Sequence, residues 1–96
     1  MMNRQILSVV QRKQFKKDYK RMESRGKDIN KLDEVVFKLM NREILPEKYR
    51  DHALKGEWEG FRECHIEPDW LLIYRIVENE LILVLTRTGT HTDLEF

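Results

Sequence analysis

Three strand-like segments in the C-terminal part of the chain, joined by very short links, constrain the fold most strongly. The segments are residues 61–66, 70–77 and 81–88, and the links are Glu-Pro-Asp (67–69) and Glu-Asn-Glu (78–80). Links this short join antiparallel neighbours, so the pattern predicts a three-stranded meander. The second and third segments are apolar on both faces, which indicates that they form the centre of the sheet.

The N-terminal half predicts one strand and two helices. Residues 5–10 (QILSVV) are apolar and end in β-branched residues, as in a strand. Residues 11–24 and 29–41 carry apolar side chains at helical spacing on otherwise charged segments. Only a few residues link these helices, so they should form an antiparallel pair. In the first helix the apolar stripe consists of Phe15, Tyr19 and Met22.

The resulting element order is β-α-α-β-β-β, with residues 47–60 irregular and the tail from residue 89 irregular or one short turn. Two helices cover one face of a sheet most simply. We therefore expect an α+β fold, in which an N-terminal strand and a helical hairpin pack on an antiparallel β-sheet. The length of 96 residues suits a single domain spanning residues 1–96.

Composition indicates a globular protein of a reducing compartment. Hydrophobic residues make up 41% of the chain and charged residues 36%, which favours folding over disorder. No stretch approaches the ~18 apolar residues of a membrane span, and the N-terminus lacks the features of a signal peptide. The single cysteine, Cys64, is expected to be a buried hydrophobe. We expect a cytoplasmic protein with no membrane partner.

Charge is distributed unevenly along the chain. Residues 1–27 hold nine Lys or Arg and two acidic residues, a net charge of +7, so residues 28–96 carry −6. The first helix is thus a basic rod on a mildly acidic body, which favours a polyanionic or acidic partner. A solvated helix face is the alternative interpretation. The lysines expected to contact RNA are Lys13, Lys16, Lys17 and Lys20.

Four polar residues should meet at one end of the sheet. His65 ends the first strand of the meander, Asp69 lies in the turn, Arg87 ends the last strand, and His91 follows shortly after. The ends of the first and third strands lie at the same edge, beside the start of the second. The face that His65 takes stays open, because a one-residue shift of register reverses it. His52 precedes the meander.

Such a set suits metal-independent RNA cleavage. A base takes the 2′-hydroxyl proton, an acid protonates the leaving 5′-oxygen, and a cation stabilises the phosphorane. Histidine suits both proton roles and arginine suits the cation. Three alternatives stay open: a zinc site built from the histidines and a carboxylate, a hydrogen-bonded surface role for each histidine, and a simple salt bridge for Arg87.

Two motifs carry a family resemblance. The segment from Asp51 to Tyr74 reads DHxLxGxWxGxRxxHxEPDWxLIY, and residues 87–91 read RTGTH. With the basic helical hairpin, they resemble the YafQ branch of the RelE/ParE toxin superfamily over nearly the whole chain. The resemblance implies a RelE-like fold and a bacterial type II toxin that enters the A site of the 70S ribosome. There it cleaves mRNA without a metal or other cofactor.

The resemblance also implies partners and site residues. A cognate antitoxin similar to DinJ would neutralise the protein, and operator DNA would be bound only through the toxin–antitoxin complex. His52, His65 and Asp69 would transfer the proton on the 2′-hydroxyl side, with His91 as general acid. The residue set at the family's catalytic and RNA-contacting positions is His52, His65, Asp69, Trp70, Arg87, His91 and Phe96. Glu95 stands where the family has an aromatic residue, which shifts that role to Phe96.

Two other functions remain as alternatives on the same fold. A ParE-like inhibitor of gyrase would not need three histidines and an aspartate at one end of a sheet. A noncatalytic RNA- or protein-binding module would need only the basic helix. Codon preference, the identity of the antitoxin and the stoichiometry of its complex are not specified by the sequence.

Overall fold

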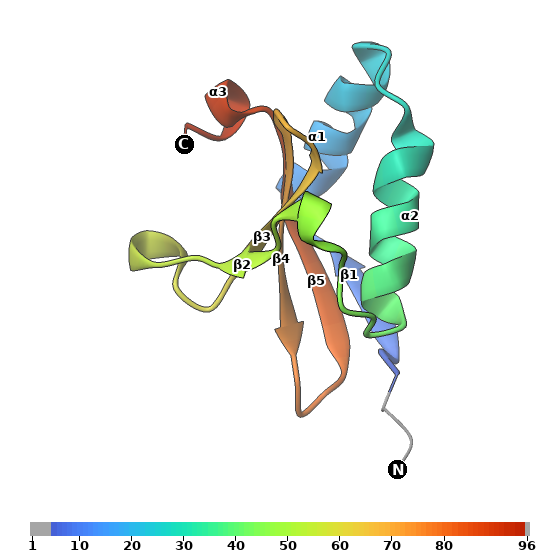
Figure 1. The fold of residues 1–96 in the computed structure, drawn as a ribbon, viewed down its shortest axis with the longest axis vertical. Helices are drawn as coiled ribbons and strands as arrows, with labels where there is room; N and C mark the ends of the chain where they lie inside the picture. The colour runs from blue at the N-terminus through green and yellow to red at the C-terminus, as the bar shows by residue number, and fades with distance from the viewer. Residues whose placement is uncertain (1–4, 96) are drawn as a thin grey trace.

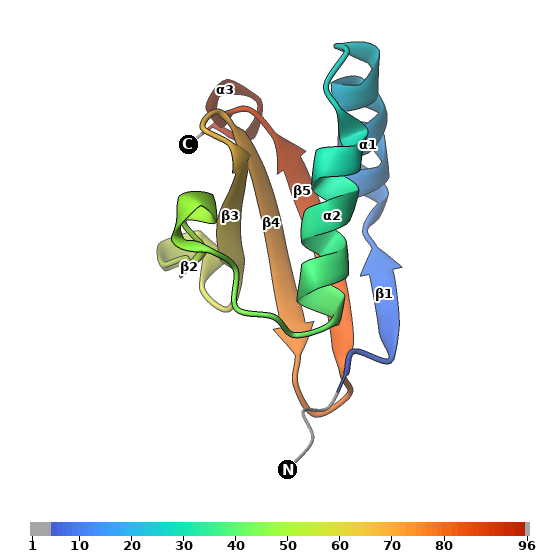
Figure 2. The ribbon, with the colours of Figure 1, turned by 45° about the vertical axis from the view of Figure 1, so that its right-hand side comes forward.

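The computed structural model describes residues 5–95. Its sheet has five strands in the order β1-β5-β4-β3-β2, and two long helices lie on one face (Figures 1 and 2). The strands are β1 (Ser8–Gln11), β2 (His52–Ala53), β3 (Arg62–Glu67), β4 (Trp70–Val77) and β5 (Ile82–Gly89). The helices are α1 (Lys13–Ser24), α2 (Ile29–Met40) and α3 (His91–Leu94), with short 3-10 turns η1 (Glu47–Tyr49) and η2 (Gly56–Trp58).

The meander forms as the sequence predicts, with β4 at the centre. β3 and β5 both pair with β4 in antiparallel register. The first five residues of β4, from Trp70 to Tyr74, are each at most 1% exposed. A strand buried on both faces needs a continuous apolar run, and residues 70–74 (WLLIY) provide it.

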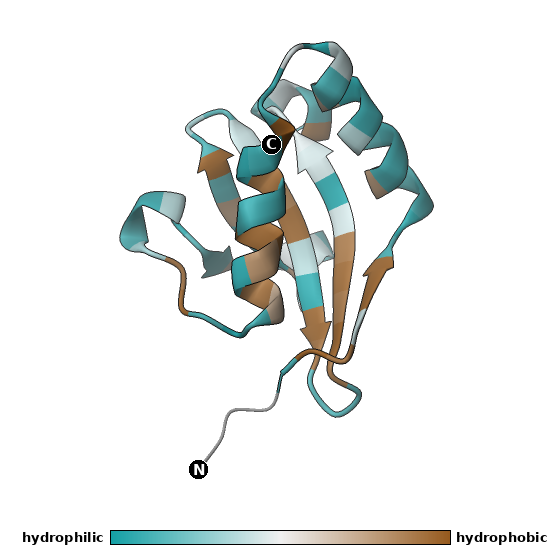
Figure 3. Cartoon of the chain, turned by 90° about the vertical axis from the view of Figure 1, so that its right-hand side faces the viewer, coloured by the Kyte–Doolittle hydropathy of each residue, from teal (hydrophilic) through white to brown (hydrophobic). Residues whose placement is uncertain are grey.

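The helical hairpin covers one face of the sheet through its apolar stripes. Phe15 and Met22 of α1 are buried with Leu32 of α2 against the strands. The exposed side of α1 is mostly hydrophilic (Figure 3). Asp28 caps α2 by accepting a hydrogen bond from the backbone N–H of Asn30 at 3.1 Å, as its short polar side chain favours. Burial of the stripes, rather than helix propensity alone, stabilises these 12-residue helices.

The predicted α+β fold is confirmed, and the structure adds the position of the N-terminal strand, which the sequence did not specify. β1 lies beside β5 in parallel register, with Ser8 opposite Ile82 and Gln11 opposite Leu85, so the sheet is mixed. Strands so far apart in sequence have no turn between them that would specify their relative direction. Gln11 lies only halfway along β5, and α1 then packs beside the remaining half of that strand.

Of two small elements, one differs from expectation and the other agrees with it. Residues 47–60 were expected to be irregular, but His52–Ala53 form the edge strand β2. The tail forms a single helical turn, α3, which was one of its two expected forms. On the face opposite α1 and α2, Leu94 of α3 packs with Leu71 and Ile73 of β4. Among residues 5–95, no helix has the length and apolar composition needed to cross a membrane.

Candidate active site

One row of cross-strand neighbours places His52, Glu63 and His65 on the face opposite α1 and α2. His52 lies opposite Glu63, and Glu63 lies opposite Ile73. Side chains of paired residues share a face of the sheet. His65, two residues after Glu63, projects to the same face, whereas Cys64 lies between them in the core beneath the helices. The register therefore decides the orientation of His65 that the sequence left open.

A buried carboxylate lies between two of the histidines. Glu63 is 7% exposed, and its Oε1 lies 3.3 Å from His65 Nε2 and 3.6 Å from His52 Nε2. His52 Nδ1 donates to the backbone carbonyl of Arg50 at 2.7 Å. A neutral His52 therefore has Nε2 available as a proton acceptor. Glu63 was not among the site residues predicted from the sequence. Its position two residues before His65 in β3 could have indicated it, because such residues lie on the same face of a strand.

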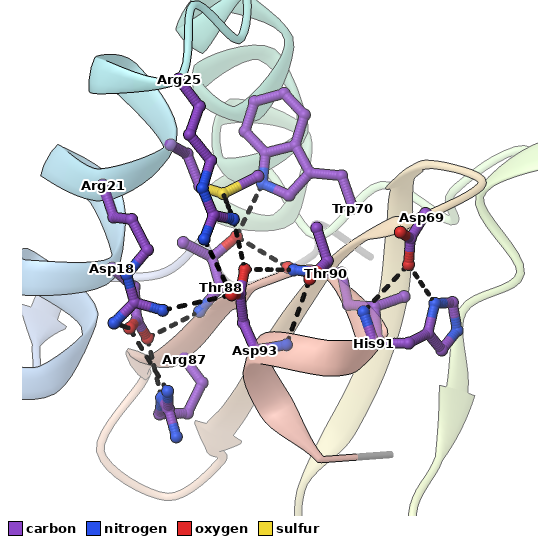
Figure 4. A network of polar contacts seen from close by, with 12 residues as sticks. Asp18, Arg21, Arg25, Asp69, Trp70, Arg87, Thr88, Thr90, His91 and Asp93 are labelled. Carbon is purple, nitrogen blue, oxygen red and sulfur yellow. Dashed lines mark hydrogen bonds and ion pairs between the residues drawn. The ribbon is translucent and has the colours of Figure 1, made fainter.

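A second carboxylate holds the third histidine. Asp69 Oδ1 accepts both the backbone N–H of His91, at 2.9 Å, and its ring Nδ1–H, at 2.5 Å (Figure 4). These hydrogen bonds, the backbone one first, lower the pKa of the Asp69 carboxyl below its usual range. The carboxylate accepts from Nδ1–H and so fixes the tautomer and the orientation of the ring. Asp69 thus pairs with His91, not with His52 and His65 as the predicted roles had it.

The two histidine groups face each other. The ring centroids of His65 and His91 are 5.8 Å apart, and the planes are tilted by 64°. The β3–β4 turn and α3 meet at the same end of the sheet (Figures 1 and 2), as the meander topology predicted. The result is an arc from His52 through Glu63 and His65 to His91 and Asp69. One group consists of His52 and His65 with Glu63, and the other consists of His91 with Asp69.

Arg87 is bound to a buried aspartate on α1. Arg87 Nε donates to Asp18 Oδ2 at 2.7 Å and Nη2 to Asp18 Oδ1 at 3.3 Å. Asp18 is fully buried and also accepts the backbone N–H of Thr88 at 3.2 Å. The salt bridge left open for Arg87 is therefore present. A signal for Asp18 exists in the sequence: it interrupts the apolar stripe between Phe15 and Met22 at helical spacing.

Trp70 does not lie where RNA contact was predicted. Its side chain is 0% exposed, and its indole Nε1–H donates to Thr88 Oγ1 at 3.0 Å. The Thr88 hydroxyl in turn donates to the backbone carbonyl of Leu71 at 2.7 Å. Trp70 is the first residue of the central strand, and its side chain is packed in the core beneath the helices. Its role is packing and orientation of β5, and it has no surface to stack on a base.

The predicted RNA-binding lysines lie on the solvent side of α1. All four are exposed, and none forms an ion pair with another residue in 5–95. By contrast, Lys27 and Lys31 both bind Glu67, each at 2.9 Å. The charges of Lys13, Lys16, Lys17 and Lys20 are therefore available to a partner. Phe96, the predicted aromatic contact, lies outside the described residues.

A cleft of about 580 Å³ adjoins His65. It lies along the part of β3 that β2 does not cover, between η1 and the start of α2. Lys48 and Arg50 are exposed at its rim, and the ring of Tyr49 lies under the Lys48 ammonium at 5.1 Å from the ring centroid. Within residues 5–95, no group of three or more His, Cys, Asp or Glu side chains has the arrangement of a metal site.

The fold of this chain, a helical hairpin on one face of a small mixed sheet, is that of bacterial toxins of known structure. The YafQ–DinJ complex of Escherichia coli contains a chain of this fold, with a TM-score of 0.82 and 42% identity over 90% of this chain and 94% of that chain. A metal-bound toxin from Helicobacter pylori gives a TM-score of 0.86 and 43% identity over 92% and 98%.

Sequence comparison narrows this class to one family. The family model described as the bacterial toxin of type II toxin–antitoxin system, YafQ, matches residues 7–95. The mRNA interferase toxin YafQ of Escherichia coli K12 is 45% identical over 82 residues, covering 84% of this chain and 87% of that protein. The chain belongs to the YafQ family of bacterial type II toxins, which confirms the resemblance of its motifs.

Proposed function

We propose that this chain is an mRNA interferase, a toxin that cleaves mRNA and is neutralised by a cognate antitoxin. The observation that carries the proposal is the pair of histidine groups on one face of the sheet, with the His65 and His91 rings 5.8 Å apart. The E. coli relative is named for mRNA cleavage and is found in complex with DinJ. A DinJ-like antitoxin is accordingly the expected partner.

The two histidine groups supply the two proton transfers. His52 or His65, beside Glu63, accepts the proton of the 2′-hydroxyl as its oxygen attacks phosphorus. His91, oriented by Asp69, protonates the 5′-oxygen as the P–O5′ bond breaks. The products are a 2′,3′-cyclic phosphate and a free 5′-hydroxyl. Each positioned acid or base contributes about 10²–10⁴-fold to such a reaction.

Arg87 stabilises the charge that develops on the phosphorane. Its Nε and Nη2 are occupied by Asp18, and within residues 5–95 its Nη1 has no hydrogen-bond partner. The ion pair fixes the plane of the guanidinium, which favours a preorganised donor over a flexible one. Arginine keeps its charge at any working pH.

The cleft beside His65 provides a path for the RNA strand. Grooves for single-stranded RNA combine positive charge along the backbone with an aromatic ring on which a base can stack. Lys48 and Arg50 supply the charge at the rim, and Tyr49 supplies the ring. A nucleotide next to the scissile phosphate occupies this cleft in the proposed complex.

The basic face of α1 binds the ribosome. Its four unpaired lysines make sequence-independent contacts to rRNA phosphates, which position a protein without reading sequence. The mRNA is then cleaved in the A site of the 70S ribosome. Operator DNA is bound only through the antitoxin complex, and the protein acts in the cytoplasm.

Single-turnover cleavage of mRNA in programmed ribosomes tests the proposal. We expect His91→Ala to lower the rate on the order of 10²–10⁴-fold with little loss of stability, since His91 is 44% exposed in its side chain. Asp33→Ala, an exposed acidic residue on α2, is the matched control. A folded His91→Ala protein that cleaves within a few-fold of wild type removes His91 as the acid.

The purified protein used for this assay also distinguishes an mRNA interferase from a gyrase inhibitor and from a noncatalytic binding module. A gyrase inhibitor leaves mRNA intact and blocks DNA supercoiling, and a binding module leaves both unaffected. Primer extension after brief induction in cells locates cleavage within codons if the proposal holds. Intact mRNA with arrested growth rejects it.

A relative from H. pylori is metal-bound, so the role of metal requires a direct experiment. Histidine and arginine supply the proposed acid, base and cation, and we expect cleavage to persist in excess EDTA when the ribosomes stay intact. Loss of cleavage that zinc alone restores, with intact ribosomes, would assign the histidines to a metal site.

A further inference from the structure

The helix that carries His91 is too short to hold its own position. α3 contains four residues, whereas isolated helices below about 12–15 residues are marginal in water. Its N-terminus is closed by a capping box, in which Thr90 Oγ1 accepts from the backbone N–H of Asp93 at 3.1 Å. This local motif shapes the turn but does not attach it to the rest of the molecule.

Leu94 packs α3 against β4, and Arg21 of α1 together with Arg25, the C-cap of that helix, attaches α3 to the helical layer. Arg25 Nη1 and Nη2 donate to Asp93 Oδ2 and Oδ1 at 2.6 and 3.0 Å, a bidentate pair, and Arg21 Nη1 lies 3.6 Å from Oδ1 (Figure 4). The Asp93 side chain is 11% exposed. The guanidinium of Arg25 lowers the pKa of the Asp93 carboxyl well below its usual range, so the pair is charged at neutral pH.

The same carboxylate fixes the chain next to His91. Asp93 Oδ2 accepts the backbone N–H of Thr90, the residue before His91, at 3.0 Å. Asp93 also packs against Gly89, where an added Cβ would lie 3.0 Å from the Asp93 Cβ. Arg25 therefore connects through one carboxylate to the backbone on both sides of the histidine.

One face of α1 holds both ends of the site. Asp18, Arg21 and Arg25 follow the i, i+3, i+7 spacing of a single helix face. Asp18 binds Arg87, and the two arginines bind Asp93. The distance between Arg87 and His91 is thereby tied to a rigid helix.

We propose that the Arg25–Asp93 ion pair positions His91 for proton transfer, which makes Arg25 and Asp93 positioning residues of the reaction. This inference rests on the proposed function. Without the pair, α3 leaves its place for part of the time, and the rate falls with the fraction of time that His91 is aligned. A misplacement of about 1 Å can lower a rate on the order of 10²-fold.

The effect on rate is separable from an effect on stability. The Arg25 side chain is 43% exposed, whereas that of Asp93 is 11% exposed, so Arg25→Gln should lose less free energy of unfolding than Asp93→Asn. The opposite end of the sheet offers a control, because Arg42 Nη2 binds Glu78 Oε2 at 2.7 Å in another arginine–carboxylate pair, in which the Glu78 side chain is 66% exposed. Glu78→Gln removes an equivalent charge far from His91.

Steady-state cleavage of ribosome-bound mRNA by Arg25→Gln, Asp93→Asn, the double variant and Glu78→Gln tests the inference. We expect kcat to fall on the order of 10–100-fold in each single variant, with KM within about twofold of wild type. The double variant should be no slower than the worse single one, because both remove the same contact. Glu78→Gln should match wild type. A folded Asp93→Asn or Arg25→Gln protein with wild-type kcat overturns the inference.

Amide hydrogen exchange gives a readout that does not depend on catalysis. The His91 N–H donates to Asp69, so it should exchange faster in Asp93→Asn and Arg25→Gln while the amide of Leu72 in β4 stays protected. Unchanged exchange at His91 overturns the inference. If the wild type itself does not cleave mRNA, the proposed function fails, and the exchange result still decides whether Arg25 and Asp93 hold His91.

Discussion

Three buried polar side chains connect the core to the candidate site. Asp18 and Thr88 are 0% exposed and Glu63 is 7% exposed. Each contacts a residue of the predicted site: Asp18 binds Arg87, Thr88 accepts from Trp70, and Glu63 lies beside His65. Buried polar groups are costly unless they are hydrogen-bonded, so these pairings restrict the rotamers of the site residues. Substituting these buried side chains, or the residues that bind them, should therefore show how far they support the site.

Asp18→Asn should weaken both stability and cleavage. The amide keeps the size of the carboxylate but loses its charge, so Arg87 and the backbone N–H of Thr88 lose a strong acceptor. We expect the free energy of unfolding in urea to fall by about 1–3 kcal/mol and kcat to fall further than the unfolded fraction explains. Asp33→Asn, which affects an exposed contact to Tyr19, is the control. Equal effects of both variants would contradict a special role for Asp18.

Trp70→Phe should affect stability rather than chemistry. The substitution removes the Nε1–H bond to Thr88 and leaves a cavity in a fully buried position. We expect a loss of about 2 kcal/mol or more in the free energy of unfolding. Cleavage measured well below the lowered Tm should stay within a few-fold of wild type. A large loss of cleavage with unchanged Tm would restore the predicted role of Trp70 in RNA contact.

At the scale of elements, α1 has a buried face that packs and holds the site and a solvent face that carries lysines. Phe15 and Met22 pack on the sheet, Asp18 and Arg25 hold the catalytic end, and the exposed lysines face solvent. A helix with separate faces can be altered on one without the other. The lysines of α1 can therefore be substituted without disturbing its buried face. The η1 turn is a separate element and can be tested by its own substitutions.

Replacing Lys13, Lys16, Lys17 and Lys20 with Gln should separate ribosome binding from folding. The Tm should change little, because exposed charges without partners contribute little to stability. Affinity for ribosomes in a sedimentation assay should fall and lose part of its salt dependence. Unchanged salt dependence would remove the basic face from the proposed interface.

The double variant Lys48→Gln, Arg50→Gln tests the cleft along β3. Both side chains are exposed at η1, so the fold should persist. We expect KM for a ribosome-bound mRNA to rise with kcat nearly unchanged, the result of losing uniform binding. Lys38→Gln on α2 serves as the control. A kcat effect without a KM effect would place Lys48 or Arg50 in the chemistry instead.

At the scale of the whole molecule, carboxylates bridge segments that are distant in sequence. Glu67 of β3 binds Lys27 and Lys31, and Asp93 of α3 binds Arg25. Hydrogen bonds from Lys31 and then Lys27 lower the pKa of Glu67, and Arg25 lowers that of Asp93. These contacts connect the helical layer to both ends of the site, and they depend on pH.

Acid should therefore destabilise the protein through these carboxylates. A carboxyl whose pKa is lower in the folded state stabilises the fold above its unfolded pKa, about 4, and this contribution disappears as pH falls toward the folded pKa. We expect the free energy of unfolding to decrease below about pH 5. The difference between wild type and Asp93→Asn should be largest at neutral pH and narrow in acid. A constant difference down to the lowest pH that permits folding would contradict the charged pair.

Local patterns of the sequence predicted the long helices and the strands other than β2. They also predicted that His65, Asp69, Arg87 and His91 gather near one end of the sheet. Alternation, helical spacing and short links depend on neighbouring residues, so they can be read directly. The motifs around His52 and Arg87 also indicated the family. Element boundaries shifted by at most three residues, as with β1, which starts at Ser8 rather than residue 5.

Only the tertiary structure decided how distant segments meet. The parallel pairing of β1 with β5, the burial of Asp18 against Arg87, the pairing of Asp69 with His91 rather than His52, and the attachment of Asp93 to Arg25 join residues far apart in the chain. No local propensity specifies such partners, because each contact forms only when the packing of the helical layer on the sheet brings the two groups together. The amino-acid types determined which acids, bases and cations were available, and packing determined which of these groups became partners.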